Sequence, residues 1–390
     1  MEGKITVFTR RVINRLGREV RNIRLRKLDI QNNKIFFMTY DNAYSCNPHA
    51  IADEIIRRKL PYDLVWASSE DGSTDGCFPS EIRQVKRASR EMFIEQATAR
   101  IWIDNAINCL WYAVPKKKDQ IYFNTWHGSM GIKRLSGNKR WLKRAGKCNA
   151  TTDYCITNSQ FEEDVFRSTF WKDTPFLKFG HARNDILFQT DQHSEISARV
   201  RQQLQIPEED HVFLYAPTFR DDMSMDWFTL DFSQLRKDLC DRFGGTWTIL
   251  IRLHFKNRDT DVFQKTKALY DFLKDAGTYP DMYELMITAD VGCTDYSSWA
   301  YDYLLMRRPL FIYAPDLDRY NDTRGFYFPL ETTPFPISKT SKEMSKQVRQ
   351  FEETKYLVGV DRFLEEKGCY EAGTAAARIV DKIEEIISSS

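Results

Sequence analysis

One stretch of the sequence predicts the fold class most directly: residues 120–135 read Gln-Ile-Tyr-Phe-Asn-Thr-Trp-His-Gly-Ser-Met-Gly-Ile-Lys-Arg-Leu. A short apolar run ends in a Trp-His-Gly corner, and a basic segment with glycines follows. Open α/β sheets present reactive side chains in this order of strand, turn and loop. A histidine held there by a tryptophan suits proton transfer near neutral pH. His127 is therefore a candidate catalytic residue; the alternative is a buried histidine satisfied by the backbone.

Short apolar runs alternate with helical stretches along the whole chain. The expected strands are residues 35–38, 64–66, 101–103, 121–123 and 154–156 in the first half, and 212–215, 247–251, 291–293 and 310–313 in the second. This alternation predicts doubly wound parallel sheets. A chain of 390 residues exceeds the size at which single cores usually stop growing, which favours two domains. We expect them at residues 29–190 and 191–390, with the C-terminal helix near 371–387 able to pack on either.

The first 28 residues are strongly basic, with nine Lys and Arg against two Glu, although the whole chain carries a net charge of only +2. Their apolar residues recur at helical spacing: Ile5, Phe8, Val12, Leu16, Val20 and Ile23. Residues 1–28 are therefore expected to form a basic amphipathic helix, which suits an anionic membrane surface. The alternative is a helix that packs on the body of the protein and exposes its arginines.

The cysteine spacing and the hydropathy of the sequence argue against disulfides, a metal site and a transmembrane helix. The eight cysteines form no Cys-x-x-Cys pair and no metal-binding spacing, which indicates reduced thiols. Two Asp-x-Asp pairs, at 259–261 and 316–318, have a spacing used for metals, but neither follows a strand as expected. No metal and no cofactor are therefore predicted. No apolar run reaches about 18 residues, so no transmembrane helix is expected, and the N-terminus lacks the apolar core of a secretion signal.

Three loops that directly follow expected strands carry groups that bind anions. They read Ala216-Pro-Thr-Phe-Arg220, Arg252-Leu-His254 and Thr294-Asp-Tyr-Ser-Ser298. The two serines precede a helix, where hydroxyls and N–H groups bind phosphate, although serine there is also an ordinary helix cap. The arginines have an equally ordinary alternative as structural ion pairs. Because all three loops lie at the carboxyl ends of strands, they indicate a site for a nucleotide diphosphate donor.

These motifs, taken together, resemble the CDP-glycerol glycerophosphotransferases, which make teichoic acids and related polyol-phosphate polymers. The likeness runs from about residue 34 to 328 and includes Trp126-His-Gly128, the three loops above, Thr157-Asn-Ser159, Gly180-His-Ala-Arg-Asn-Asp185, Arg308–Asp318 and Arg324-Gly-Phe326. The sequence departs from the family after Trp-His-Gly, where Ser129-Met-Gly-Ile-Lys133 replaces the common Thr-Pro-Leu-Lys. This departure makes the acceptor less certain than the class of donor.

The resemblance implies a glycosyltransferase-B-like architecture, with two Rossmann-like domains facing a central cleft. It implies CDP-glycerol as donor, with CDP-ribitol or a capsular polyol-phosphate transferase as the alternative, and CMP as leaving group. His127 would be the general base, and His254 would also act in catalysis. The donor phosphates would contact Thr218, Arg220, Arg252, His254, Thr294, Asp295, Ser297 and Ser298.

A second basic segment follows the His127 corner, and it has no acidic residue between 128 and 148. The residues expected to face the acceptor or the membrane are Lys133, Arg134, Arg140, Trp141, Lys143 and Arg144. With the N-terminal helix, this segment predicts a peripheral enzyme at the cytoplasmic face of the membrane, acting on a lipid-linked saccharide in a priming or short-extension step. Nucleic-acid binding is disfavoured because the body of the protein is acidic. The oligomeric state is left open.

Overall fold

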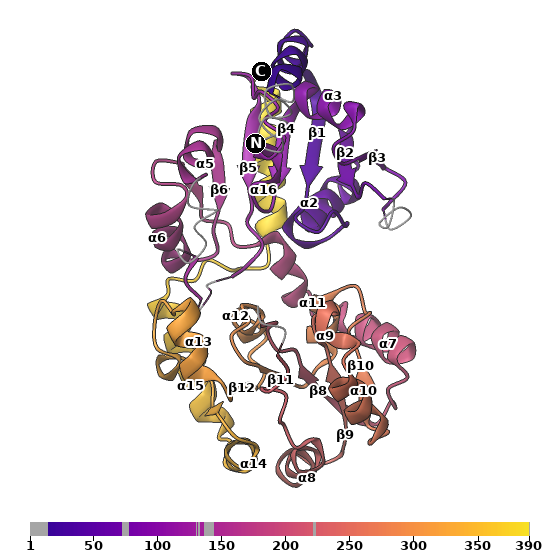
Figure 1. The fold of residues 1–390 in the computed structure, drawn as a ribbon, viewed down its shortest axis with the longest axis vertical. Coiled ribbons are helices and arrows are strands. Elements are labelled where there is room, and N and C mark those ends of the chain that lie inside the picture. Colours follow the sequence, from indigo (N-terminus) through magenta and orange to yellow (C-terminus); the bar gives the residue numbers. More distant parts are fainter. Residues whose placement is uncertain are drawn as a thin grey trace, which may run out of the picture.

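The computed structural model describes residues 15–71, 78–129, 131, 133–135, 144–220 and 224–389. Two parallel β-sheets form separate halves of the molecule, called here the first and second units (Figure 1). Both sheets have the doubly wound strand order, with crossovers running in both directions from the first strand. The α/β class expected from the alternating pattern is confirmed.

The first sheet has the order β3-β2-β1-β4-β5-β6-β7. Its strands are β1 (Gln31–Met38), β2 (Asp63–Ser68), β3 (Ile82–Lys86), β4 (Ala99–Asp104), β5 (Ile121–Asn124), β6 (Tyr154–Ile156) and β7 (Phe176–Leu177). Its helices are α2 (Cys46–Arg57), α3 (Arg90–Thr98), η1 (Asn108–Leu110), α5 (Ala145–Thr151), α6 (Gln160–Thr169) and η3 (Ala182–Leu187). The strand order reverses between β1 and β4, the position at which open sheets bind ligands.

The second sheet has the order β10-β9-β8-β11-β12-β13, and its reversal lies between β8 and β11. The strands are β8 (Asp210–Tyr215), β9 (Thr246–Ile251), β10 (Leu273–Asp275), β11 (Val291–Thr294), β12 (Leu310–Tyr313) and β13 (Ile337–Ser338). The helices are α7 (His193–Leu204), α8 (Phe232–Phe243), α9 (Phe255–Arg258), α10 (Asp261–Ala268), α11 (Met282–Thr288), α12 (Trp299–Leu304), α13 (Leu317–Arg324), η4 (Leu330–Thr332), α14 (Ser341–Arg349) and α15 (Glu353–Glu366).

The last helix, α16 (Ala375–Ser388), returns to the first unit. Its apolar side chains Ile379, Val380 and Ile383 are fully buried against the face of the first sheet that also carries Ile35 and Ile101. The structure therefore differs from the expected extent of the second domain, residues 191–390, because α16 completes the core of the first. The alternating pattern could not show this, since an amphipathic helix fits either sheet.

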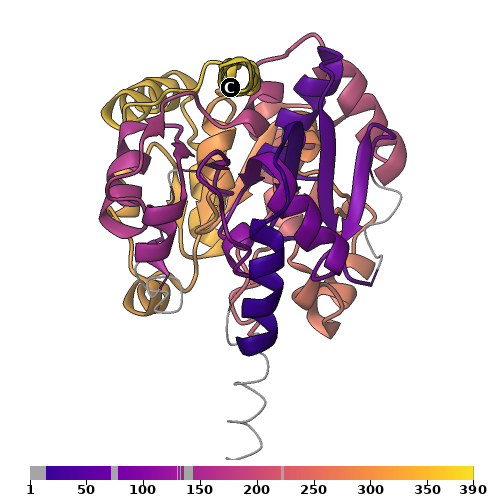
Figure 2. The same cartoon turned by 90° about the horizontal axis from the view of Figure 1, so that it is seen from above.

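Residues 15–26 are helical and pack on the first unit, with Leu25 buried in its core. Arg21 and Asn22 donate hydrogen bonds to the carbonyl oxygens of Tyr112 and Ala113. Figure 2 shows this helix at one edge of the unit and α16 at the opposite edge. Residues 1–14 of the expected helix lie outside the described residues. In the described part of the chain, no helix has the length and apolarity needed to span a membrane.

Candidate active site

His127 lies in the turn that follows β5, at the carboxyl end of the first sheet. Its Nδ1 is 2.6 Å from the carbonyl oxygen of Asn105, and since a carbonyl only accepts, Nδ1 carries the proton. The neutral ring then has its basic lone pair on Nε2. Burial lowers the pKa of His127 to about 4, so the ring is neutral at physiological pH.

The turn itself is held by buried polar contacts. Trp126 has a positive φ of 53° and is fixed by a hydrogen bond from its N–H to Asn124 Oδ1. The ring centre of its indole lies 4.5 Å from that of the His127 imidazole, and the ring centre of Tyr40 lies 5.0 Å from the same imidazole. Asp104, which is buried, accepts from the N–H groups of Ala106 and Cys109 and so orders the loop containing the Asn105 carbonyl. The histidine is thus oriented by rigid neighbours.

The Ser297–Ser298 loop of the second unit lies beside this turn. A Cβ added to Gly128 would be 3.6 Å from Ser298 Oγ. Ser298 is the N-cap residue of α12, yet its side chain makes no capping hydrogen bond. Within the described residues, neither serine hydroxyl has a hydrogen-bond partner, and both residues are partly buried. Their hydroxyls are therefore not used as ordinary helix caps.

Arg220, by contrast, is committed to structural contacts. Its guanidinium donates to Asp316 at 2.7 Å and 2.8 Å, to Asp295 at 2.8 Å and to the carbonyl of Thr218 at 2.6 Å. The side chain is 4% exposed. The expected contact of Arg220 with donor phosphates is not supported by this geometry, because most of its N–H groups are already used. The ion-pair alternative describes it instead, and Asp316 of the Asp-x-Asp pair 316–318 is its partner.

Two further members of the expected donor set also hold the loops. Asp295 accepts hydrogen bonds from the N–H of Thr218 and the N–H of Tyr296, and Thr294 Oγ1 donates to the carbonyl of Ala216. Thr218 Oγ1, however, is buried and has no hydrogen-bond partner in the described residues. Thr218 thus offers a donor or acceptor to a ligand, while Asp295 and Thr294 order the loops.

Arg252 and His254 follow β9, next to β8 in the sheet. Arg252 is partly buried, and its Nη1 donates to the carbonyl of Tyr279; burial lowers its pKa from the ordinary value. His254 is exposed, and its ring packs 4.8 Å from that of Phe219. A cation and an imidazole therefore stand at the carboxyl end of β9 in the second unit.

A buried polar network joins the two units through Ser129, two residues after His127. Ser129 Oγ donates to Asp302 on α12, and Arg183 Nη2 lies 3.1 Å from Ser129 Oγ and 3.2 Å from Asp302 Oδ2. Asn184 donates to Asp302 at 3.1 Å. Since α12 begins directly after Ser298, the network ties the His127 turn of one unit to the Ser297–Ser298 loop of the other.

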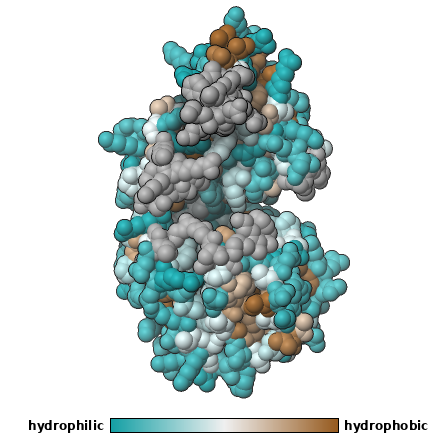
Figure 3. Space-filling view, in the orientation of Figure 1, coloured by the Kyte–Doolittle hydropathy of each residue, from teal (hydrophilic) through white to brown (hydrophobic). Residues whose placement is uncertain are grey.

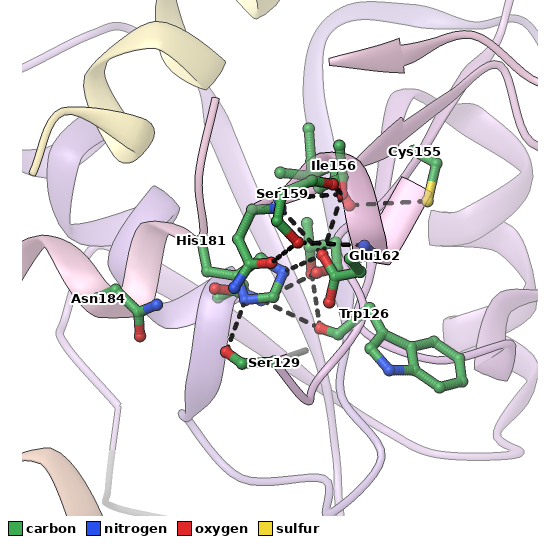
Figure 4. Close-up of polar contacts among 12 residues, drawn as sticks. Trp126, Ser129, Cys155, Ile156, Ser159, Glu162, His181 and Asn184 are labelled. Carbon is green, nitrogen blue, oxygen red and sulfur yellow. Dashed lines mark hydrogen bonds and ion pairs between the residues drawn. The ribbon is translucent and has the colours of Figure 1, made fainter. Parts of the chain in front are cut away.

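His181 extends this network into the first unit. Its ring lies between Ser129 and Glu162, with Nε2 3.1 Å from Glu162 Oε2 (Figure 4). Burial opposes the charged ring, but the Glu162 carboxylate raises the pKa of His181 above its ordinary value. Asn184 also donates to Glu371 at 2.7 Å, and burial raises the pKa of Glu371 to about 7.

The second basic segment is only partly described. Lys133 forms a β-bridge with Phe326, and the backbone N–H and Nε of Arg134 donate to the carbonyls of Gly325 and Phe326. The backbones of these two residues therefore join the two units. Arg144 lies over the Trp111 ring. Arg140, Trp141 and Lys143 lie outside the described residues.

The residues that sequence reasoning missed are Tyr40, Asn105, Asp302 and Glu371, which touch the His127 ring or form the network between the units. Tyr40 and Asn105 lie within two residues of the ends of β1 and β4, so the rule that ligands bind at the carboxyl ends of strands would have found them. Asp302 and Glu371 carry no such signal. Among the described residues, no group of three His, Cys, Asp or Glu side chains is placed to hold a metal ion.

The chain matches one family of known proteins over most of its length. The family model described as CDP-Glycerol:Poly(glycerophosphate) glycerophosphotransferase matches residues 20–385. The chain is 28% identical over 376 residues to the teichoic acid poly(glycerol phosphate) polymerase of Bacillus spizizenii, covering 90% of this chain and 91% of the relative. It is 28% identical over 381 residues to the teichoic acid glycerol-phosphate transferase of Staphylococcus aureus, covering 92% and 94%.

The solved structure of the wall teichoic acid polymerase TagF matches with a TM-score of 0.83 and 27% identity, over 100% of this chain and 99% of that one. A variant of the same polymerase soaked with CDPG matches with a TM-score of 0.84. Two other polymerase relatives are longer proteins, and the chain spans 49% and 48% of their length. Relatives named for ribitol phosphate match at 24% to 25% identity.

Proposed function

The chain belongs to the CDP-glycerol:poly(glycerophosphate) glycerophosphotransferase family and is a glycerophosphotransferase of teichoic acid synthesis, and we propose that it transfers glycerol phosphate from CDP-glycerol to a lipid-linked saccharide in a priming or short-extension step. The observation that carries the proposal is the meeting of two loops from different units: the His127 turn and the Ser297–Ser298 loop, which approach at Gly128 and Ser298.

In the proposed reaction, the second unit holds the donor and the first unit activates the acceptor. The Ser297 and Ser298 hydroxyls, with Thr218, Arg252 and His254, bind the diphosphate of the donor. Positioning and charge stabilisation carry most of the catalysis in phosphoryl transfer, so donor-binding groups of this kind are the main requirement.

His127 removes the proton from the acceptor hydroxyl. Because Nδ1 is committed to the Asn105 carbonyl, Nε2 is the atom that receives this proton. The acceptor oxygen forms a bond to the phosphorus that carries glycerol, the bond from that phosphorus to the CMP oxygen breaks, and CMP leaves with the electron pair. Arg252 and His254 stabilise the charge on the leaving group.

The acceptor side is proposed to face a membrane, with the enzyme bound peripherally at its cytoplasmic face. Leu16, Val20 and Ile23 on the helix of residues 15–26 are 61%, 51% and 53% exposed. They share one face of the helix, opposite Leu25, and a hydrophobic patch lies over this helix (Figure 3). An exposed apolar stripe flanked by arginines is typical of interfacial helices.

The proposal is tested by CMP release from CDP-glycerol and from CDP-ribitol, with a lipid-linked disaccharide analogue that carries either no glycerol phosphate or one. Turnover of CDP-glycerol on the bare disaccharide identifies a priming enzyme, and turnover only on the primed acceptor identifies an extending one. Turnover of CDP-ribitol but not of CDP-glycerol would show that the donor is CDP-ribitol, in line with the relatives named for ribitol phosphate. No CMP from either donor, with folded protein, would contradict the proposal.

A further inference from the structure

A pocket of about 210 Å³ lies in the first unit, among the helix of residues 15–26, η1 and α5. It is lined by Arg18, Ile107, Leu110, Trp111, Ala113, Arg144, Lys147 and Cys148. Ile107, Leu110 and Cys148 are buried members of the core and give the pocket an apolar floor. The remaining long side chains are three cations and a tryptophan.

The three cations gather with no counter-ion among the described residues. None of the described residues that line the pocket is acidic, and in the described part of the chain neither Arg18, Arg144 nor Lys147 is paired with a carboxylate. The guanidinium carbon of Arg144 lies 3.9 Å from the centre of the Trp111 ring, and Lys147 Nζ donates to the carbonyl of Leu110 at 3.3 Å. These contacts orient the two side chains but neutralise neither charge.

Like charges that converge in this way repel one another, and a bound anion would relieve the repulsion. The effect is visible on Lys147, whose pKa is lowered by burial and by the neighbouring Arg144 and Arg18. The floor adds a second requirement, since it offers apolar surface directly beneath the charges. A ligand with a phosphate at one end and an apolar part beside it satisfies both requirements, whereas a free phosphate ester uses only the charges.

We propose that this pocket binds the phosphate of an anionic phospholipid headgroup, with the first carbons of the lipid against the apolar floor. Trp111, 44% exposed at the rim, is a residue type favoured where an apolar phase meets water. Arg18 points toward the pocket from the same helix whose opposite face carries Leu16, Val20 and Ile23. The inference rests on the proposed membrane association and names a specific lipid contact within it.

The test is a calorimetric titration of the whole protein with dihexanoyl phosphatidylglycerol, below its micelle concentration and at physiological ionic strength. We expect Arg18→Gln/Lys147→Gln to weaken binding about tenfold or more, since both substitutions remove a cation that lines the pocket. The matched control is Arg24→Gln/Arg26→Gln, which removes the same charge from exposed positions of the same helix outside the pocket. It should change binding by less than about twofold. Equal weakening by both double variants, or no binding by the wild type, would overturn the proposal.

A second titration, with glycerol 3-phosphate, separates the lipid from a free phosphate ester. Weak or no binding of the ester is expected, and binding as tight as that of the lipid would overturn the assignment to a phospholipid. CMP release by the wild-type enzyme on a water-soluble acceptor analogue is measured alongside. If the wild type releases CMP normally but the lipid titrations fail as described above, only the pocket proposal is contradicted. If the wild type releases no CMP, the proposed function is contradicted.

Discussion

His127, the proposed general base, is kept neutral by its surroundings, and this makes a prediction about pH. Burial lowers its pKa to about 4, so the fraction of active, unprotonated base falls only as the pH decreases through that value. We therefore expect kcat/KM for CMP release to be flat from about pH 5.5 to 7 and to decline with a midpoint near pH 4, because kcat/KM reports the free enzyme. An acidic limb near the ordinary histidine value of about 6.5 would contradict this environment for His127.

Arg220 is the residue whose role the structure changes most, from a donor-binding candidate to the centre of a buried ion-pair cluster. Arg220→Met leaves Asp295 and Asp316 without their counter-charge, and we expect a loss of about 3–5 kcal/mol in the free energy of unfolding, measured by urea denaturation.

Ser298→Ala is the matched control from the same site, because its hydroxyl makes no hydrogen bond to any described residue. It should leave the unfolding free energy within about 0.5 kcal/mol and weaken CDP-glycerol binding about tenfold. Equal loss of stability in both variants would contradict the separation of structural and donor-binding residues.

At the scale of helices and strands, the central strands were predictable and the edges were not. All nine expected strands are present, because central strands of parallel sheets are continuous apolar runs. The four that were missed are β3, β7, β10 and β13, which lie at the two edges of each sheet. β3 has only two buried residues, Ile82 and Val85, with two exposed residues between them, and β7 and β13 have two residues each, so hydrophobic patterning gives them little signal.

The candidate site, too, could be predicted from the sequence only in part. Loops that directly follow strands were found from the sequence, since the sheet topology brings them together. Whether a side chain in such a loop meets a ligand or a carboxylate of the protein depends on contacts distant in sequence, such as Arg220 with Asp316. The return of α16 to the first unit is a contact of the same kind.

The Ser129–Asp302 contact couples the turn after β5 to α12, and it predicts a difference between two substitutions. Ser129→Ala removes the hydroxyl that donates to Asp302 and accepts from Arg183, so we expect a loss of about 1–3 kcal/mol in the unfolding free energy. Ser129→Thr keeps the hydroxyl and should lose less than about 1 kcal/mol. Thermal unfolding of both variants measures the difference, and equal losses would show that packing rather than the hydroxyl matters at this position.

At the scale of the whole molecule, an apolar stripe on the helix of residues 15–26 predicts binding to membranes. Replacing Leu16, Val20 and Ile23 by Gln should leave the melting temperature nearly unchanged, because the side chains are mostly exposed, and should reduce sedimentation with anionic vesicles severalfold.

The matched control replaces three other exposed apolar residues, Val262, Leu269 and Val358, which lie on the second unit. It removes a similar amount of exposed apolar surface and should leave sedimentation unchanged. A similar loss in both triple variants would mean that this helix is not the membrane-binding surface.

The central claim is a division of labour: the first unit supplies the base and the second holds the donor. The most direct test compares His127→Ala with His254→Ala, measuring single-turnover CMP formation and the Kd for CDP-glycerol in each. His127→Ala should lower the rate of CMP formation by about 10²–10⁴-fold and leave the Kd nearly unchanged, whereas His254→Ala should raise the Kd as well as lower the rate. Near-normal CMP formation by His127→Ala would contradict the account.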